Sequence, residues 1–270
     1  MKSVYDCEII DQTEISPEVF RTRLIGPEIA REAIAGQFLN VQVSRTMDPL
    51  LRRPFSVHAV DPANGIFSLL YVVVGRGTEL LKHIPAGEKV SVVGPLGRGF
   101  DLGDAPATHI VVAGGCGAAP LHFLCDALCA KWGCESVTVM TGGRTKNAVL
   151  CEAEFRSHGV EVDVTTDDGS YGHRGFVTQH LEKRLREGIG SDVRVYSCGP
   201  HPMMREVARI CREAKVSSCQ VSLENNMACG IGVCMGCVQK VRRAESGADW
   251  HYERVCKDGP VFNAEDIVWE

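Results

Sequence analysis

Three closely spaced cysteines near the C-terminal end limit the folds open to this chain more than any other feature. Cys229, Cys234 and Cys237 follow a C-x4-C-x2-C pattern, and Cys256 follows further along. This is the ligand spacing of plant-type [2Fe–2S] loops, in which four thiolates complete two tetrahedral iron sites. The loop is rich in glycine, which allows unusual dihedrals and lets backbone N–H groups approach the sulfur atoms. The pattern therefore predicts a [2Fe–2S] cluster on these four cysteines.

A zinc site is the alternative for the same cysteines. Zinc ligands usually come as two pairs of short spacing, and Cys256 has no close partner in the sequence, so the cluster is favoured. The chain has 13 cysteines, an odd number, and its N-terminus has no signal-peptide core. A secreted disulfide framework is therefore not expected. We expect the remaining cysteines to be buried as small apolar residues.

The composition is that of an ordinary globular protein. Of the 270 residues, 44% are hydrophobic and 23% are charged, and the length allows two domains and a small third. The net charge is −5 and no basic stripe occurs, so neither nucleic acid nor an anionic membrane is an expected partner. No apolar run approaches the roughly 18 residues that a membrane span needs. We therefore expect a cytoplasmic protein.

The first part of the chain has the pattern of a small antiparallel β-barrel. Short apolar runs alternate with Pro, Gly and Asn turns, which predicts strands separated by tight connections. Helix signals are sparse, and only residues 77–83 fit a short helix. The expected strands are residues 19–24, 38–43, 55–60, 66–74 and 89–93.

The second part alternates strands with helices, which predicts a doubly wound parallel sheet covered on both faces. The expected strands are residues 110–113, 136–140, 160–165 and 193–197, and the expected helices are 120–132, 148–158, 176–187 and 202–214. The alternation stops near residue 218. We therefore predict a barrel domain over residues 1–102, an α/β domain over 103–217 and a small metal-binding domain over 218–270.

Residues 53–56 read Arg-Pro-Phe-Ser at the start of an expected strand. A guanidinium at a barrel mouth can neutralise a diphosphate, and a serine hydroxyl can hydrogen-bond a flavin ring nitrogen. Gly77 and Thr78 stand at an expected helix start, where N–H groups and a hydroxyl can meet phosphate. A bend at a strand entrance explains the tetrapeptide equally well, so these residues alone leave flavin binding open. The candidate flavin residues are Arg53, Pro54, Phe55, Ser56, Leu70, Tyr71, Val72, Gly77 and Thr78.

A glycine-rich turn follows the expected strand at residues 110–113 and precedes an expected helix. Such a turn presents N–H groups and the helix dipole to a pyrophosphate. It lacks the complete G-x-G-x-x-G fingerprint, so a plain tight connection is the alternative. Turns after other strands would lie at the same edge, where open α/β sheets bind ligands. The candidate nucleotide residues are Gly114, Gly115, Gly117, Asp167, Cys198, Gly199 and Pro200.

Two neighbouring carboxylates bear on the choice of nucleotide. Asp167 or Asp168 can accept hydrogen bonds from a ribose 2′-OH, whereas either would repel a 2′-phosphate. Arg144 or Lys146 would favour NADPH instead, although exposed loop cations are usually only solvated. We therefore expect NAD(H).

The order of barrel, nucleotide domain and four-cysteine segment resembles one known family over essentially the whole chain. It is similar to the electron-transfer subunits of dihydroorotate dehydrogenase B, within the ferredoxin–NADP⁺ reductase superfamily. The resemblance rests on residues 53–56, 75–78, 94–97, 114–120 and 197–200, on Met203 and on the four cysteines.

The resemblance implies a β-barrel plus α/β architecture with one cofactor in each domain. The barrel would bind FAD through the candidate flavin residues, the doubly wound domain would bind NAD(H), and the small C-terminal domain would bind one [2Fe–2S] cluster. The family partner is an FMN-containing dehydrogenase subunit that oxidises dihydroorotate to orotate in pyrimidine biosynthesis. A heterotetramer with two copies of each subunit is expected by the same resemblance.

These expectations describe an electron relay in which FAD exchanges a hydride with NAD(H) and single electrons with the cluster. No side-chain acid or base is needed, and we name no catalytic residue. One alternative keeps the fold and changes the partner, as in subunits of sulfide dehydrogenases, ferredoxin–NADP⁺ oxidoreductases and hydrogenases. Another is a zinc-stabilised nucleotide-binding sensor without electron transfer.

Overall fold

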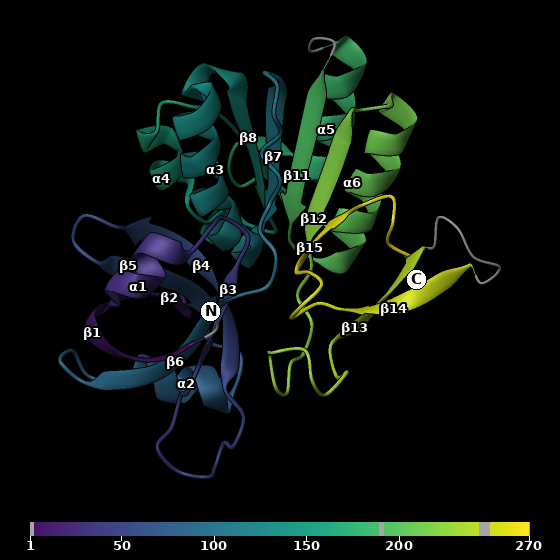
Figure 1. Cartoon of the computed structure of the whole chain (residues 1–270). Coiled ribbons are helices and arrows are strands. Elements are labelled where there is room, and N and C mark those ends of the chain that lie inside the picture. The colour runs from purple at the N-terminus through teal and green to yellow at the C-terminus, as the bar shows by residue number, and fades with distance from the viewer. Residues whose placement is uncertain (1–2, 189–191, 243–248, 270) are drawn as a thin grey trace.

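The computed structural model describes residues 3–188, 192–242 and 249–269. Its N-terminal part is a closed barrel of six antiparallel strands in the order β1-β2-β5-β4-β3-β6 (Figure 1). The strands are β1 (Ser3–Ser16), β2 (Val19–Ile25), β3 (Phe38–Val41), β4 (Arg53–Asp61), β5 (Ile66–Val72) and β6 (Lys89–Leu96), with helices α1 (Pro27–Glu32) and α2 (Arg76–Lys82). The predicted antiparallel barrel is confirmed. Along β6 every second residue is buried, which is the period expected when one face of a strand fills the barrel.

The central part of the chain forms a seven-stranded sheet in the order β10-β9-β8-β7-β11-β12-β15. Its strands pair in parallel except for β15, which pairs antiparallel with β12 at the edge. The strands are β7 (Thr108–Gly114), β8 (Val137–Gly143), β9 (Glu161–Thr166), β10 (His173–Arg174), β11 (Val193–Cys198), β12 (Ser218–Ser222) and β15 (Val261–Asn263). The predicted doubly wound parallel sheet is confirmed.

Two helices cover each face of this sheet, as Figure 1 shows. They are α3 (Ala118–Trp132) and α4 (Glu152–Ser157) on one face, and α5 (Val177–Glu187) and α6 (His201–Ala214) on the other. The central strand β7 serves both faces, because Val111 and Ala113 belong to one buried cluster while Ile110 and Val112 belong to the other. This explains why β7 reads as a continuous apolar run in the sequence.

Helix α3 joins the barrel to the sheet. It is buried almost all round in its N-terminal half, and Leu121 and Leu124 share one apolar cluster with Val57 of β4 and Val111 of β7. The barrel and the α/β part therefore pack through a common core.

Several elements of the observed fold have no counterpart in the sequence-based expectations, among them α1, β1 and the C-terminal strands. Strands β12 and β15 fall in the segment predicted as a metal-binding domain, yet they complete the sheet of the α/β part. β12 has only five residues, and β15 has three and runs antiparallel, so neither shows the strand–helix alternation on which the prediction relied. The hairpin of β13 (Val238–Arg242) and β14 (Trp250–Arg254) lies beyond them.

No helix in the described parts of the chain is both long enough and apolar enough to cross a membrane.

A buried histidine in this sheet makes the stability of the fold depend on pH. His109 of β7 is inaccessible to solvent, and its Nδ1 lies 3.2 Å from the hydroxyl of Tyr196 on β11. Burial, together with the charge of Arg194, lowers the pKa of His109 from 6.5 to about 4. The folded protein therefore favours the neutral form of the His109 imidazole over the protonated form.

We predict that the free energy of unfolding falls as the pH is lowered from 7 to 4. The pKa of His109 is lower in the folded than in the unfolded chain, so its contribution is complete above pH 6.5 and is lost as the pH falls toward 4. The loss attributable to this residue is about 1–3 kcal/mol. Urea unfolding of the wild type and of His109→Gln at pH 7, 5.5 and 4 measures it. Equal pH dependence in both proteins would contradict the prediction.

Candidate functional site

A cavity of about 530 Å³ lies between the mouth of the barrel and the segment that follows β12. Gly77, on α2, lies behind the cavity wall, since a Cβ there would stand 2.5 Å from Nε of Arg53. The antiparallel pairing of β4 with β5 explains how two distant sequence segments reach one cavity. The structure thus brings the predicted flavin residues together; those that line the cavity are Arg53, Pro54, Phe55, Ser56, Leu70, Tyr71, Val72 and Thr78.

Two polar side chains of this cavity, Arg53 and Thr78, already hydrogen-bond to nearby backbone groups. Nη1 of Arg53 donates to the carbonyl of Leu51 at 2.6 Å. The hydroxyl of Thr78 accepts the N–H of Val74 at 3.0 Å and donates to the carbonyl of Gly75 at 2.9 Å. Thr78 therefore shapes the loop before α2, and the N–H groups and guanidinium beside it remain the donors suited to a diphosphate.

Tyr71 forms part of the rigid wall of the same cavity. Its hydroxyl donates to Oε1 of Gln12 at 3.0 Å, and its ring centroid lies 5.2 Å from that of Phe55. Burial raises the pKa of Tyr71 to about 12, so the phenol stays neutral. Gln12 and Phe55 thus hold the Tyr71 side chain in place, and Tyr71 presents an apolar ring to the cavity.

A second cavity, of about 560 Å³, lies at the carboxyl ends of the parallel strands. Gly114, Gly115, Asp167 and Pro200 line it, as predicted for a nucleotide site at this edge of the sheet. Arg144 lines it as well, so the carboxylate that would favour NADH and a cation that would favour NADPH share one wall. Asp168 is absent from that wall, and its carboxylate accepts the N–H of Ser170 at 2.9 Å.

A third cavity, of about 290 Å³, adjoins the other two. It shares Gly114, Gly115 and Pro200 with the nucleotide cavity, and Cys116, Leu223, Glu224 and Asn225 with the flavin cavity. Glu224 lines both the third cavity and the flavin cavity, although the residue is exposed to solvent overall. The shared walls show that the nucleotide and flavin cavities meet at this junction.

The glycines of the nucleotide turn are required by close packing. A Cβ on Gly117 would stand 2.2 Å from the carbonyl oxygen of Cys198, and one on Gly199 would stand 3.0 Å from Cα of Gly114. Gly199 also has a φ of +157°, at the edge of the left-handed region. Two strand-end turns, after β7 and after β11, therefore meet backbone to backbone. Cys198 itself is fully buried beneath this contact, so its side chain packs under the turn, and its part in cofactor binding stays a prediction.

The four cysteines of the predicted cluster gather around the loop at residues 229–237, which Figure 1 shows beside the barrel. The N–H groups of Val233 and Cys234 both lie 3.4 Å from Sγ of Cys229. Burial opposes ionisation of Cys229, but these N–H groups and that of Ile231 outweigh it and lower the pKa of the thiol to about 6. Backbone donors around thiolates are what an iron–sulfur loop requires.

The β13–β14 hairpin brings the fourth cysteine to this loop. Val238 pairs with Arg254, and the N–H of Val255 donates to the carbonyl of Cys237 at 2.9 Å. The N–H of Cys256 then lies 3.4 Å from Sγ of Cys237. The distance in sequence between Cys237 and Cys256 is therefore bridged by an ordinary antiparallel pair.

Contacts from outside fix the shape of the loop. Nη1 of Arg254 donates to the carbonyl of Gly232 at 2.9 Å, and Arg254 also pairs with Asp258. Gly230 has a φ of +68°, and a Cβ there would stand 2.4 Å from Nδ2 of Asn40. Nδ2 of Asn40 itself donates to the carbonyl of Cys229 at 3.2 Å. The residues present thus fit a cluster whose loop is fastened to the barrel.

The flavin cavity and the cysteine loop share a wall. Asn225, Asn226 and Met227 line the cavity and lead directly into Cys229, while Pro260 lines it from the chain that follows Cys256. The N–H of Arg98, at the end of the barrel domain, donates to the carbonyl of Gly259 at 2.6 Å. Barrel, cavity and cluster loop are therefore one packed unit.

Sequence reasoning missed the segment at residues 223–227 and Cys116, although both line two of the cavities. The segment follows β12, so recognising this short strand would have placed residues 223–227 at the ligand-binding edge of the sheet. Cys116 stands inside the predicted glycine turn and could have been included with it.

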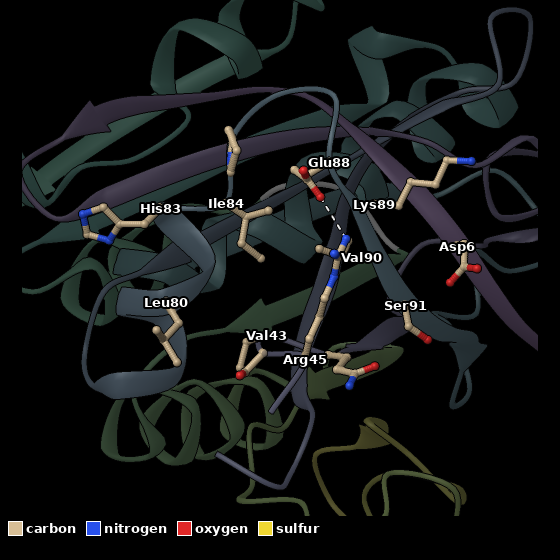
Figure 2. Close-up of a pocket in the computed structure, with 13 residues that line it drawn as sticks. Asp6, Val43, Arg45, Leu80, His83, Ile84, Glu88, Lys89, Val90 and Ser91 are labelled. Atoms are coloured by element: carbon tan, nitrogen blue, oxygen red, sulfur yellow. Dashed lines mark hydrogen bonds and ion pairs between the residues drawn. The ribbon is translucent and has the colours of Figure 1, made fainter. Parts of the chain in front are cut away.

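The largest cavity described, of about 710 Å³, shares no lining residue with the flavin, nucleotide and third cavities. It is bounded by β6 and the end of α2, and the ion pair between Arg45 and Glu88 crosses it, as Figure 2 shows. None of the predicted site residues lines it. Size alone therefore does not identify the functional cavity.

Three family models match consecutive parts of the chain. The oxidoreductase FAD-binding domain matches residues 6–100, and the oxidoreductase NAD-binding domain matches residues 111–209. The iron–sulfur cluster binding domain of dihydroorotate dehydrogenase B matches residues 224–268. The chain thus has an FAD-binding, an NAD-binding and an iron–sulfur domain, as the sequence predicted.

Similar proteins match over nearly the full length. The dihydroorotate dehydrogenase B (NAD(+)) electron transfer subunit of Desulforamulus reducens is 40% identical over 270 residues, which is 100% of both chains. That of Geobacillus thermodenitrificans is 40% identical over 262 residues, 96% of both. A solved structure of an NADH-dependent reduced ferredoxin–NADP oxidoreductase matches with a TM-score of 0.83 and 30% identity, covering 97% of this chain and 90% of that chain.

We predict that Asp167→Asn lowers the preference for NADH over NADPH. The amide keeps the shape of the side chain but removes the charge that repels a 2′-phosphate and weakens the hydrogen bond to a ribose hydroxyl. The ratio of kcat/KM for NADH to that for NADPH should fall about tenfold, measured anaerobically with an artificial electron acceptor. Asp168→Asn is the matched control, because Asp168 does not line the cavity. An effect of Asp168→Asn with none of Asp167→Asn would contradict the prediction.

Proposed function

The chain belongs to the family of dihydroorotate dehydrogenase B electron transfer subunits, and we propose on this basis that it serves an FMN-containing subunit that oxidises dihydroorotate to orotate. The chain is an NAD-dependent oxidoreductase subunit that transfers electrons between NAD(H) and its partner. The identity of the partner's flavin, and a heterotetramer with two copies of each subunit, are parts of the proposal.

One observation carries the proposal: the cavities follow one another in the order that electron transfer needs. The third cavity adjoins the nucleotide cavity at Gly114 and Gly115 and the flavin cavity at Cys116 and Glu224. Residues 225–227 line the flavin cavity and lead into the cluster loop. When bound, FAD exchanges a hydride with NAD(H) and single electrons with the cluster. The role of the chain is to hold the two cofactors and the nucleotide in this order.

The residues that line the cavities supply binding and orientation. Arg53 offers its guanidinium to the diphosphate of FAD, and Ser56 offers a hydroxyl to the flavin ring. The turn at Gly114, Gly115 and Gly117 would offer N–H groups to the pyrophosphate of NAD(H), and Asp167 would accept a hydrogen bond from the ribose. No side chain needs to donate or accept a proton in the transfer itself, so no catalytic acid or base is proposed.

The exposed side of the cysteine loop is the surface we propose for contact with the partner subunit. Cys234 is exposed, and Ile231, Val233 and Met235 around it are exposed apolar side chains, with Val233 75% accessible. Exposed apolar residues that surround a redox centre favour contact with another protein. Docking there would cover the loop and shorten the path from the cluster to the partner's flavin.

A partner of another kind is the second candidate. The match to the ferredoxin–NADP oxidoreductase structure, at 30% identity, favours a ferredoxin-linked complex of the same architecture. The matches to dihydroorotate dehydrogenase B subunits reach 40%, and they favour the first candidate. Reduction of NAD⁺ by dihydroorotate, with the catalytic subunit from the same source added, distinguishes the two.

We further propose that the protein works in the cytoplasm. None of the thirteen cysteines, all of which lie in the described residues, forms a disulfide, which suits a reducing compartment in which NAD(H) is available.

We predict that Cys234→Ser abolishes electron transfer to the partner and leaves the reaction of NADH with FAD intact. A serine oxygen is a poor iron ligand, so the cluster is lost, but the nucleotide and flavin cavities do not include this residue. Partner reduction should fall by about a hundredfold or more, while NADH-dependent reduction of ferricyanide continues.

Cys134→Ser is the matched control, because Cys134 is a partly buried thiol at the far end of α3 and should leave both reactions unchanged. Undiminished transfer to the partner in Cys234→Ser would contradict the proposed path.

A further inference from the structure

A histidine, a cysteine and a glutamate meet where the barrel packs against the α/β part. They are His58 of β4, Cys151 just before α4, and Glu154 of α4. Nε2 of His58 lies 3.7 Å from Sγ of Cys151 and 3.7 Å from Oε2 of Glu154. One ligand atom from each residue lies within 4.8 Å of the others. The electron relay uses none of these side chains.

The separations fit one small metal ion. Zinc takes nitrogen, sulfur and oxygen ligands at about 2.0–2.3 Å, and a tetrahedron with such bonds has edges of about 3.3–3.8 Å. For these atom types the edges are about 3.5 Å between nitrogen and sulfur and about 3.3 Å between nitrogen and oxygen. The two contacts of 3.7 Å are a few tenths of an ångström longer, so a small movement of the side chains would close the tetrahedron around an ion. The contact between Nε2 of His58 and Oε2 of Glu154 is longer than an ordinary hydrogen bond from a ring nitrogen to oxygen, whereas 3.7 Å between a ring nitrogen and a sulfur is within hydrogen-bond reach. The three ligand atoms are therefore gathered closely enough for one zinc ion to bind all of them after a small adjustment of the side chains.

The surrounding residues orient the three ligand atoms. Nδ1 of His58 lies 3.0 Å from the hydroxyl of Ser68, which leaves Nε2 as the coordinating nitrogen. Nη1 of Arg21 donates to Oε1 of Glu154 at 3.0 Å, so the other oxygen, Oε2, is the one turned to His58. Second-shell hydrogen bonds of this kind fix the ligands of known metal sites.

The backbone at Cys151 is unusual. Its φ is +60°, in the left-handed region that residues other than glycine seldom adopt. This conformation places the buried thiol toward His58 at the start of α4. Strain of this kind at a buried, chemically reactive side chain is common at functional sites.

A neighbouring group of side chains is less suited to a metal. His122 stacks on His58 with ring centroids 4.6 Å apart, but both of its ring nitrogens have partners, the carbonyl of His58 at 3.1 Å and Nε2 of His158 at 3.1 Å. Nδ1 of His158 pairs with Asp126 at 3.2 Å. This chain of contacts supports the strand that carries His58 and leaves the coordinating role to the first group.

The group can be reached from outside. A cavity of about 430 Å³ is lined by Cys151 and Glu154, together with Ile15, Lys146 and Tyr171. It supplies an entry path for an ion and space for a water molecule as the fourth ligand.

We propose that His58, Cys151 and Glu154 form a binding site for one zinc ion, completed by water, that joins the barrel to the α/β part. Thiolate, imidazole and carboxylate together suit zinc better than the hard ions calcium and magnesium. His58 belongs to the flavin-binding barrel and the other two ligands to the nucleotide-binding part. A metal there clamps the two parts whose junction carries the electrons.

The direct test is zinc K-edge X-ray absorption on the anaerobically purified protein with its flavin and cluster in place. This measurement is specific for zinc, so iron and flavin do not interfere. After addition of one equivalent of zinc and removal of the excess, we expect one zinc per chain with one sulfur at about 2.3 Å and the other ligands nitrogen or oxygen at about 2.0–2.2 Å. Four sulfur ligands would mean that zinc had entered the cluster loop, and that result would overturn the proposal.

Variants provide the second arm of the test. Cys151→Ser and His58→Gln should each bind zinc at least about tenfold more weakly, measured by competition with a chelator of known affinity. Cys7→Ser is the matched control, because Cys7 is a buried thiol of the barrel outside the site, and it should bind zinc as the wild type does. Failure of the wild type to bind zinc, or unchanged binding by Cys151→Ser, would overturn the proposal.

Discussion

Both larger parts of the protein hold the C-terminal segment of residues 229–260, which carries the four cysteines, through hydrogen bonds, and the arrangement of the redox groups depends on these bonds. On the barrel side, Arg98 binds the carbonyl of Gly259 and Asn40 binds the carbonyl of Cys229. On the sheet side, the N–H of Leu223 donates to the carbonyl of Pro260 at 2.9 Å, next to the pairing of β12 with β15. The C-terminal segment therefore lies where flavin and nucleotide sites meet.

The second constraint is the close contact of two strand-end turns. Gly117 and Gly199 have no room for a side chain, because the turns after β7 and β11 meet backbone to backbone, and a Cβ on Gly114 would meet the side chains of Met203 and Pro200. That contact brings the nucleotide cavity close to the flavin cavity, at a helix N-terminus of the kind that binds phosphate. Packing and binding thus impose the same residue type at these positions.

Site residues could be predicted best from the sequence where the chemistry of the bound group fixes the spacing of its ligands along the chain. The spacing of Cys229, Cys234 and Cys237 is set by the coordination geometry of the cluster, and it could therefore be recognised in the sequence. The number of residues between Cys237 and Cys256 is not fixed in this way. The flavin residues follow from a short motif, but only the pairing of β4 with β5 shows why Arg53 and Leu70 face the same cavity.

The parts that sequence reasoning missed depend on contacts between distant segments. Strands β12 and β15 are too short to stand out by their periodicity, and they are defined by their pairing in the sheet. The wall at residues 223–227 follows from β12 and was missed with it. The group of His58, Cys151 and Glu154 joins residues from two domains, and nothing in their spacing along the chain predicts it.

The central claim is that electrons from NADH reach the cluster through the flavin within this one chain. The most direct measurement is an anaerobic NADH titration of the purified protein, followed by visible absorption and by electron paramagnetic resonance. The account predicts about two irons per FAD, uptake of about three electrons per chain, and a reduced-cluster resonance that grows as the flavin absorbance falls. Bleaching of the flavin with no cluster resonance, or a colourless protein that contains zinc in place of iron, would contradict the account.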